Sequence, residues 1–125
     1  MVRVSQDWKT AYPGAAAGVL VMRQVGNPTQ HPGLDRWITE CEGELRARFQ
    51  TSDRAALKAL PPIQAYAAYY KRYKKTYHVQ LQLESVALKG KAIPRSPALV
   101  AAMVTAELKN LLLTAGHDLE VVQPP

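Results

Sequence analysis

The sequence feature that most limits the possible folds is a nearly continuous apolar run at residues 17–25. The run lies between two chain-breaking segments, Pro13-Gly14 and Gly26-Asn27-Pro28. A short run that contains three valines and is closed by such residues is typical of a strand buried on both faces. It is far shorter than the ~20 apolar residues that a membrane-spanning helix needs. We therefore expect a buried strand in a soluble protein that crosses no membrane.

Apolar residues at helical spacing predict helices along most of the remaining chain. Five helices are expected over residues 5–12, 33–50, 62–77, 83–89 and 97–113. A further short helix is expected to be capped by Thr51 or Ser52 and to end before Pro61-Pro62. In the last of these, Ser96 is expected to cap the first turn and Pro97 to occupy the first helical position. Gly116 is expected to terminate it.

Two further segments, 2–4 and 119–122, have the composition of short strands. The predicted fold class is therefore α+β, a helix-rich small domain with a few-stranded sheet. The 125 residues predict a single domain over 1–125. A sheet of two or three strands leaves open edges, so the chain is a possible homo-oligomer.

The positive charge is concentrated in one part of the chain. Residues 1–60 carry eight basic and six acidic side chains, whereas residues 71–95 carry seven basic side chains and one acid, Glu84. The seven are Lys71, Arg72, Lys74, Lys75, Lys89, Lys91 and Arg95. Such a concentration attracts polyanions. A solvated helix face would account for it equally well.

Tyrosines alternate with these cations between residues 66 and 77. Lys and Arg can neutralise phosphates, and a tyrosine ring can stack on an unpaired base. The helical spacing of Tyr66, Tyr70 and Tyr73 predicts that these rings pack in the core. Tyr69 and Tyr77 are the better candidates for exposed rings.

Several classes of chemistry find no support in the sequence. The single cysteine, Cys41, lies on the apolar face of the helix predicted at 33–50, which favours a buried structural thiol. No cluster has the spacing of a metal site, and no glycine-rich phosphate loop is present, so no metal and no cofactor is predicted. The N-terminus lacks a hydrophobic signal core, which favours a cytoplasmic location.

Five segments together resemble the B3/B4 domain, the tRNA-binding editing module of the phenylalanyl-tRNA synthetase β subunit, which also occurs as free-standing proteins. They are Tyr69-Tyr-Lys-Arg-Tyr73, Glu84-Ser-Val-Ala-Leu88, Gly90-Lys-Ala-Ile-Pro94, Leu99-Val-Ala-Ala-Met103 and Leu113-Thr-Ala-Gly-His-Asp-Leu119. The resemblance covers nearly the whole chain and corresponds to the N-terminal half of that domain. A homo-oligomer or a partner that supplies the other half-domain is therefore expected.

The resemblance implies binding of tRNA or aminoacyl-tRNA, and hydrolysis of mischarged aminoacyl-tRNA. Its implied catalytic residues are Arg95, which precedes the apolar helix, and His117, which follows it. The charge concentration supplies the candidate RNA-binding residues, which are Lys71, Arg72, Lys74, Lys75, Lys89 and Lys91. The chain departs from the family at residues 100–104, where a polar Val-Asp-x-x-Asn pattern is replaced by apolar residues. An RNA-binding module is the first interpretation, and an editing hydrolase or a non-catalytic scaffold fragment are the alternatives.

Overall fold

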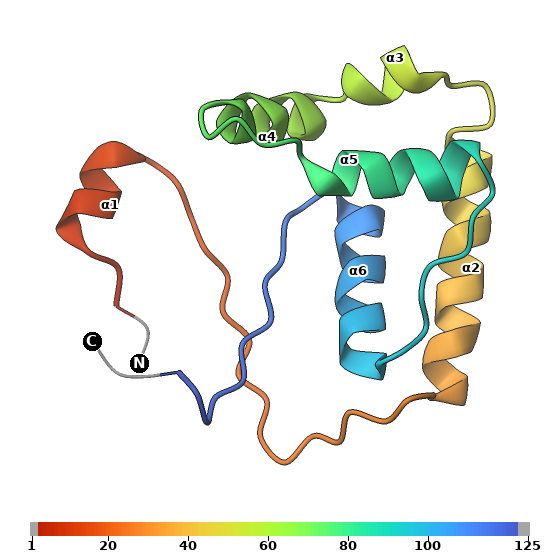
Figure 1. Ribbon diagram of the computed structural model, residues 1–125, viewed down its shortest axis with the longest axis horizontal. Helices are drawn as coiled ribbons and strands as arrows, with labels where there is room; N and C mark the ends of the chain where they lie inside the picture. The colour runs from red at the N-terminus through yellow and green to blue at the C-terminus, as the bar shows by residue number, and fades with distance from the viewer. Residues whose placement is uncertain (1–2, 123–125) are drawn as a thin grey trace.

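The longest helix, α2 (Pro32–Arg48), forms one side of the helical core (Figure 1). The computed structural model describes residues 3–122. Helix α2 begins at Pro32, whose missing N–H is not needed in the first turn. The His31 Nδ1 accepts a hydrogen bond from the Leu34 N–H at 3.2 Å and so caps the helix. The start predicted from the sequence is therefore correct to within one residue.

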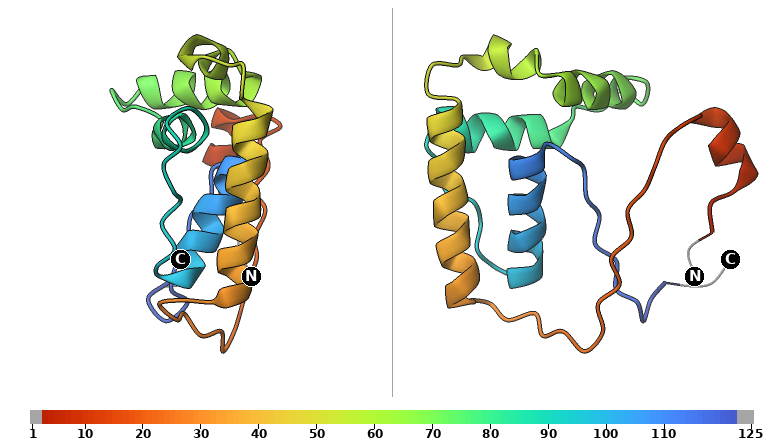
Figure 2. Two further views of the ribbon diagram at one scale, coloured as in Figure 1. Left: turned by 90° about the vertical axis from the view of Figure 1, so that its right-hand side faces the viewer. Right: turned by 180° about the vertical axis from the view of Figure 1, so that it is seen from behind.

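Helix α2 packs against two other elements to form the core. Helix α6 (Ala98–Asn110) runs beside it in the same direction, and α5 (His78–Leu83) crosses near their C-terminal ends (Figures 1 and 2). Helix α5 continues directly into a π-helical turn, η1 (Glu84–Leu88), which contacts α2. The buried apolar side chains of these elements include Ile38, Leu45, Val79, Leu83, Val86, Ala101 and Leu108.

Two shorter helices lie on the other side of α5 and form a second layer (Figure 1). Helix α3 (Arg54–Lys58) and helix α4 (Pro61–Lys71) contribute Leu57 and Ile63 to the core, and both side chains are fully buried. Helix α4 extends past the N-terminal end of α5. Its last turn and the loop that follows are therefore exposed to solvent.

The helices between residues 51 and 88 differ from the prediction at their ends. Asp53, and not Thr51 or Ser52, caps α3, because its Oδ1 accepts the Ala56 N–H at 2.8 Å. Helix α4 ends at Lys71 instead of 77, because the backbone turns into the left-handed region at Lys74. This reversal lets α5 begin at residue 78, before the predicted start at 83.

The last helix, α6, also differs from the prediction at both ends. Pro97 takes the N-cap position in an extended conformation, so Ser96 is not the cap. The Leu99 N–H donates instead to the side-chain Oδ1 of Asn27, at 3.0 Å, from a segment 72 residues away. The helix ends at Asn110 through a left-handed Leu111, and the predicted termination at Gly116 is wrong.

Residues 3–122 contain no strand, so the predicted α+β fold with a small sheet is wrong and the fold is helical. Residues 17–25 have no regular secondary structure, and no backbone hydrogen bond joins residues 16–25 to another described segment. Residues 119–121 form a turn. In the predicted strand 2–4, Val2 lies outside the described residues, and the other two are not in a strand. An apolar composition makes a strand only where a second strand supplies hydrogen bonds.

Helix α1 (Gln6–Ala11) lies apart from the core and was predicted at nearly this position. The Ser5 hydroxyl caps it by accepting the Trp8 N–H at 3.2 Å. Among residues 3–122, no helix combines the length and apolar character that crossing a bilayer requires.

Candidate nucleic-acid interface

The chain between α4 and α5 forms a tight loop with four exposed cations, which we call the basic loop (Lys71, Arg72, Lys74, Lys75). Lys74 is left-handed, with φ of 54°. Its N–H donates to the Lys71 carbonyl at 3.0 Å, and the Lys75 N–H donates to the Tyr70 carbonyl at 3.1 Å. This pair of bonds is the Schellman arrangement, which satisfies the last carbonyls of the helix with backbone alone.

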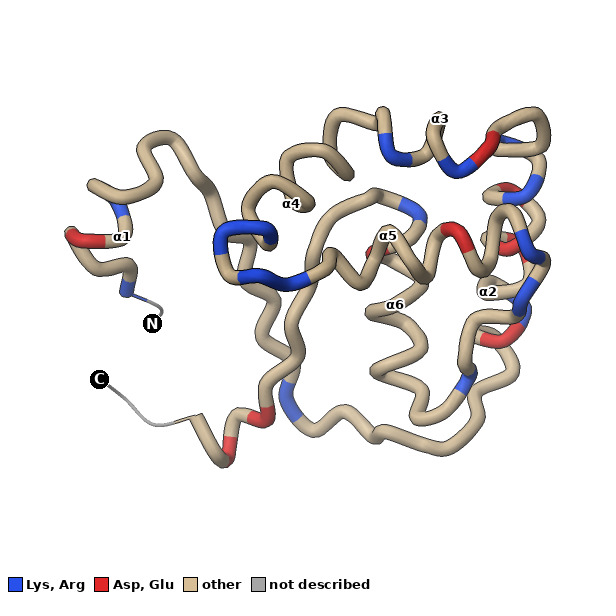
Figure 3. The backbone as a smooth tube through the Cα atoms, turned by 45° about the horizontal axis from the view of Figure 1, so that its top comes forward, with Lys and Arg blue, Asp and Glu red and all other residues tan. Residues whose placement is uncertain are grey.

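The four cationic side chains of the basic loop are therefore not needed to hold the loop in its conformation. None of the four cations forms an ion pair with a carboxylate of residues 3–122. Figure 3 shows them together in one turn of the tube, with no acidic residue adjacent to them. Unpaired, hydrated cations in a small area create a local positive potential.

An aromatic cluster (Trp8, Tyr12, Tyr69, Tyr70, Tyr73) lies directly beside the basic loop. The ring centroid of Tyr69 lies 5.3 Å from that of Tyr73 and 6.0 Å from that of Tyr12. The ring centroid of Trp8 lies 6.0 Å from that of Tyr12. Tyr73 is 56% exposed and Tyr69 is 40% exposed. The cluster therefore presents ring surface to solvent at the edge of the cationic patch.

A cavity of about 360 Å³ opens within this cluster. Its lining is mainly aromatic and apolar: Trp8, Tyr12, Ala15, Ala65, Tyr66, Tyr69 and Leu113. Its volume lies at the lower end of the range of ligand clefts, ~300–1,000 Å³. Tyr69 lines the cavity and contacts Tyr73, which lies between Arg72 and Lys74, so a single ligand can reach both the cavity and the basic loop.

Two hydroxyl groups of the cluster interact across the molecule. The Tyr12 and Tyr73 hydroxyl oxygens lie 3.4 Å apart. The hydrogen bond between them raises the pKa of Tyr12 to about 12 and lowers the pKa of Tyr73, with Tyr69 adding to both effects. A hydrogen bond from the Tyr12 hydroxyl stabilises the phenolate form of Tyr73, and this lowers the pKa of Tyr73.

The structure corrects the prediction of which tyrosines are buried. Tyr73, expected in the core, is the most exposed of them, and Tyr77, expected at the surface, is 1% exposed. Helical spacing fails here because α4 ends before both residues. Tyr77 stacks on Tyr66 with centroids 4.8 Å apart, and burial raises the pKa of its hydroxyl. Tyr69 is exposed, as predicted.

Lys89 and Lys91 lie away from the basic loop. Lys89 and Lys91 follow η1, whereas the basic loop precedes α5. Helix α5 and η1 form a continuous helix of eleven residues, about 16 Å long, between the two groups of cations. The Gly90 and Lys91 carbonyls accept hydrogen bonds from the Arg46 guanidinium at 3.2 and 3.3 Å, which holds this segment on α2. The cations of 71–95 thus form two groups rather than one surface.

Arg95 is held by helix α2. Its Nη1 donates to the Glu42 Oε1 at 3.2 Å and its Nη2 to the Thr39 hydroxyl at 2.9 Å. The same Glu42 oxygen accepts the Ile93 N–H at 2.7 Å, and Glu42 is buried. The guanidinium therefore fastens the segment before α6 onto α2, a structural role that the sequence did not reveal.

His117 lies in the extended segment that follows α6 and is exposed. Arg95 and His117 thus occupy segments on opposite sides of α6 in the chain. The described hydrogen bonds of Arg95 all go to α2 and to the Ile93 carbonyl.

The thiol and the potential metal ligands take no part in the candidate site. Cys41 is buried as predicted, and burial raises the pKa of its thiol. Residues 3–122 contain no group of three or more His, Cys, Asp or Glu side chains that could hold a metal ion. Trp8 and Tyr12 belong to the site but were missed. The only sequence signal for them was their spacing of four on a predicted helix.

The chain matches no protein-family model, no curated protein and no solved structure. Its resemblance to the B3/B4 domain therefore stays a prediction from the sequence.

Proposed function

We propose that this protein is an RNA-binding module whose ligand is a tRNA. In this proposal the basic loop contacts phosphates and the aromatic cluster stacks on an unpaired base. Proteins recognise RNA in single-stranded loops and ends in this way, because unpaired bases can stack on aromatic rings.

The observation that carries the proposal is the juxtaposition of four unpaired cations and two exposed tyrosine rings. Cations alone would attract any polyanion, and tyrosines alone would indicate packing. Tyr73 lies within the basic loop itself, between Arg72 and Lys74. A phosphate and its base are similarly close, so one nucleotide can contact both kinds of group.

The sequence resemblance to the B3/B4 domain is what selects tRNA among RNAs. A cytoplasmic location, expected from the N-terminal sequence, is part of the same proposal. Hydrolysis of aminoacyl-tRNA is not part of the proposal. The guanidinium of Arg95 is engaged by Glu42 and Thr39, so no described observation favours its action on a substrate.

The test is a salt titration of binding to fluorescently labelled tRNA, followed by anisotropy. A triple variant, with Lys71, Lys74 and Lys75 changed to Ala, is expected to bind more weakly. The slope of log K against log salt is expected to fall in magnitude by about 2, because each lost phosphate contact removes about 0.7–0.9.

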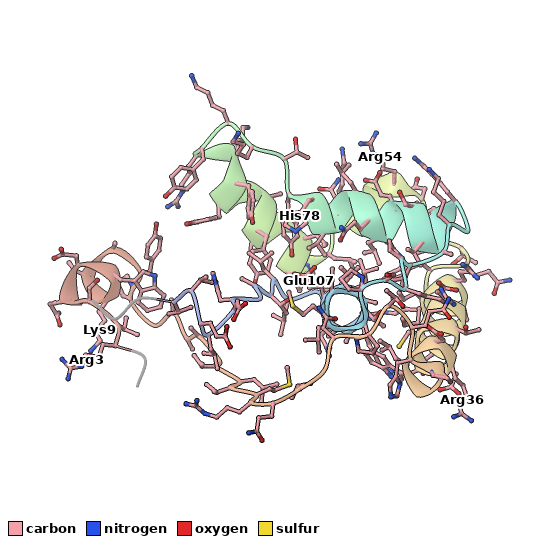
Figure 4. All side chains as sticks on the ribbon, turned by 60° about the horizontal axis from the view of Figure 1, so that its bottom comes forward. Arg3, Lys9, Arg36, Arg54, His78 and Glu107 are labelled. Atoms are coloured by element: carbon pink, nitrogen blue, oxygen red, sulfur yellow. The ribbon has the colours of Figure 1, made fainter. Side chains whose placement is uncertain are left out.

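The matched control removes three exposed cations elsewhere, with Arg36, Arg48 and Lys58 changed to Ala. Figure 4 shows Arg36 on the outer side of α2, far from α4. This variant has the same net charge as the first and is expected to keep the slope of the wild type. Equal slopes for the two variants would show that only net charge matters and would contradict the proposal.

Stacking is tested at Tyr73. Replacement by Ala is expected to weaken binding by about 1–3 kcal/mol per stacked base, whereas replacement by Phe keeps the ring and the affinity. Equal affinity for heparin and tRNA, unchanged in Tyr73→Ala, would show a non-specific polyanion surface. Lys89→Ala with Lys91→Ala tests separately whether the second cationic group contacts phosphate.

A further inference from the structure

Two segments outside the helical core expose apolar side chains to an unusual extent. We call residues 15–25 and 112–122 the arm segments. Leu20 is 82% exposed and Val121 is 73% exposed, and Val19, Val21, Met22, Val25, Leu112, Leu119 and Val122 are also exposed. Scattered apolar residues at a surface are ordinary, but a contiguous group of this size marks an interaction site.

The surface area of the whole chain supports the same conclusion. The chain exposes 9421 Å², whereas a compact protein of 13.8 kDa exposes about 6,600 Å². The excess is far larger than the ~800 Å² per partner that a stable interface buries. The chain as a whole thus exposes more additional area than a specific dimer needs.

The backbone of the first arm segment lacks partners, whereas in the second the Leu113 and Thr114 N–H groups donate to Tyr66 and Glu107. No backbone hydrogen bond joins residues 16–25 to another segment of residues 3–122. In Figure 1 both arm segments lie on the same side of the helical core, between the core and α1. Two extended segments are too few for a stable sheet, which needs three or more strands. Two arm segments from each of two chains supply four extended segments.

The charges of the two arm segments are complementary. Arg23 is the single charged residue of 15–25, and Asp118 and Glu120 are the charged residues of 112–122. None of the three forms an ion pair within the described chain. A two-fold axis would place residues 15–25 of each chain against residues 112–122 of its partner, so that the same contact forms twice.

We propose that the arm segments dock onto the arm segments of a second copy of this chain and form a closed, two-fold symmetric dimer. Each copy adds the unpaired backbone of residues 16–25 to its partner, as in recognition by strand addition. The apolar run 17–25, which as a sequence reads as a buried strand, becomes buried only in this assembly.

The test measures the mass of the full chain by light scattering after size-exclusion chromatography, over a range of concentrations. The expected result is a dimer. Val21→Lys, which inserts one charge per copy and so two per interface, is expected to weaken dimerisation about 100-fold. The control is Val100→Lys, an apolar residue of α6 that is 47% exposed outside the arms, and it is expected to leave the dimer intact.

Charge complementarity is tested by exchange. Arg23→Glu is expected to weaken the dimer, and adding Glu120→Arg to it is expected to restore affinity. Helical circular dichroism at 222 nm checks that each variant stays folded, since the arms lie outside the helices.

Three outcomes would overturn the proposal. The first is a monomer at all concentrations, and the second is a dimer that Val21→Lys leaves unchanged. The third is a stable complex with a different polypeptide in place of the dimer, which would assign the arms to another occupant. Loss of RNA binding in the basic-loop variants does not affect any of these results, so the two proposals fail separately.

Discussion

The hydroxyl groups of Tyr12 and Tyr73 are joined by a hydrogen bond of 3.4 Å across 61 residues of sequence. The bond connects α1, which lies outside the core, to the basic loop at the end of α4. Tyr69 contacts both rings from α4. The exposed ring of Tyr73 is therefore held in place at the point where we propose that a base stacks.

Removing the Tyr12 hydroxyl is expected to shift the pKa of Tyr73. In Tyr12→Phe the pKa of Tyr73 should rise toward 10, because its phenolate loses the hydrogen bond that stabilises it. The reciprocal variant, Tyr73→Phe, should lower the pKa of Tyr12 from about 12 toward 10. Tyrosine ring NMR signals followed against pH measure both. An unchanged Tyr73 in the first variant would show that no such bond forms.

Glycine at the left-handed position of the basic loop is expected to stabilise the protein. Lys74→Gly should raise the free energy of unfolding by about 0.5–1 kcal/mol, because a side chain in the left-handed region is strained and glycine is not. Lys75→Gly removes the same charge at a position that is not left-handed, and should not stabilise. Urea denaturation compares them, and equal effects would argue against strain at Lys74.

Removal of the buried Glu42 carboxylate is expected to destabilise the protein far more than removal of Glu44 on the same helix. Glu42→Ala should lower the free energy of unfolding by about 3 kcal/mol, since it leaves the Ile93 N–H and the Arg95 guanidinium without their acceptor. Glu44→Ala removes the exposed ion pair with Lys109 and should change it by at most about 1 kcal/mol. Similar losses in the two variants would contradict the structural role of Glu42.

Glu84 is expected to make stability depend on acid pH. Burial favours its protonated form, but hydrogen bonds from Gln80 and Arg54 outweigh burial and lower its pKa below 4.5. The stabilisation is therefore complete above the pKa of the unfolded chain and is lost as the pH falls through the folded pKa.

The measurement is the urea midpoint between about pH 7 and pH 3. Glu84→Gln should flatten the acid limb of this profile, whereas Glu40→Gln, at an exposed position, should leave it unchanged. A profile that is identical in wild type and Glu84→Gln would exclude Glu84 as the source of acid sensitivity.

Local signals in the sequence were sufficient for most helices. The apolar spacing between Leu34 and Phe49 predicts α2 closely, because the periodicity acts within the helix itself. The charge concentration likewise identified the four cations of the basic loop, although the apolar spacing placed them on a helix over 62–77. These four cations are adjacent in sequence, so any compact loop keeps them together.

Features that depend on distant residues were not predicted. The cap of α6 comes from Asn27, and the acceptor for Arg95 comes from Glu42, each more than 50 positions away. The separation of Lys89 and Lys91 from the basic loop follows from the intervening helix, which was predicted too short. The sequence therefore identified the cations of the candidate site but not the rings of Trp8 and Tyr12.

The sequence by itself determined where helices form and where positive charge gathers, because both follow from residues that are neighbours along the chain. Only the tertiary structure decided whether residues 17–25 are a strand, which tyrosines are exposed and what Arg95 binds. Each of these depends on a hydrogen-bonding or packing partner that is remote in sequence, and a one-dimensional pattern does not contain the distance to that partner.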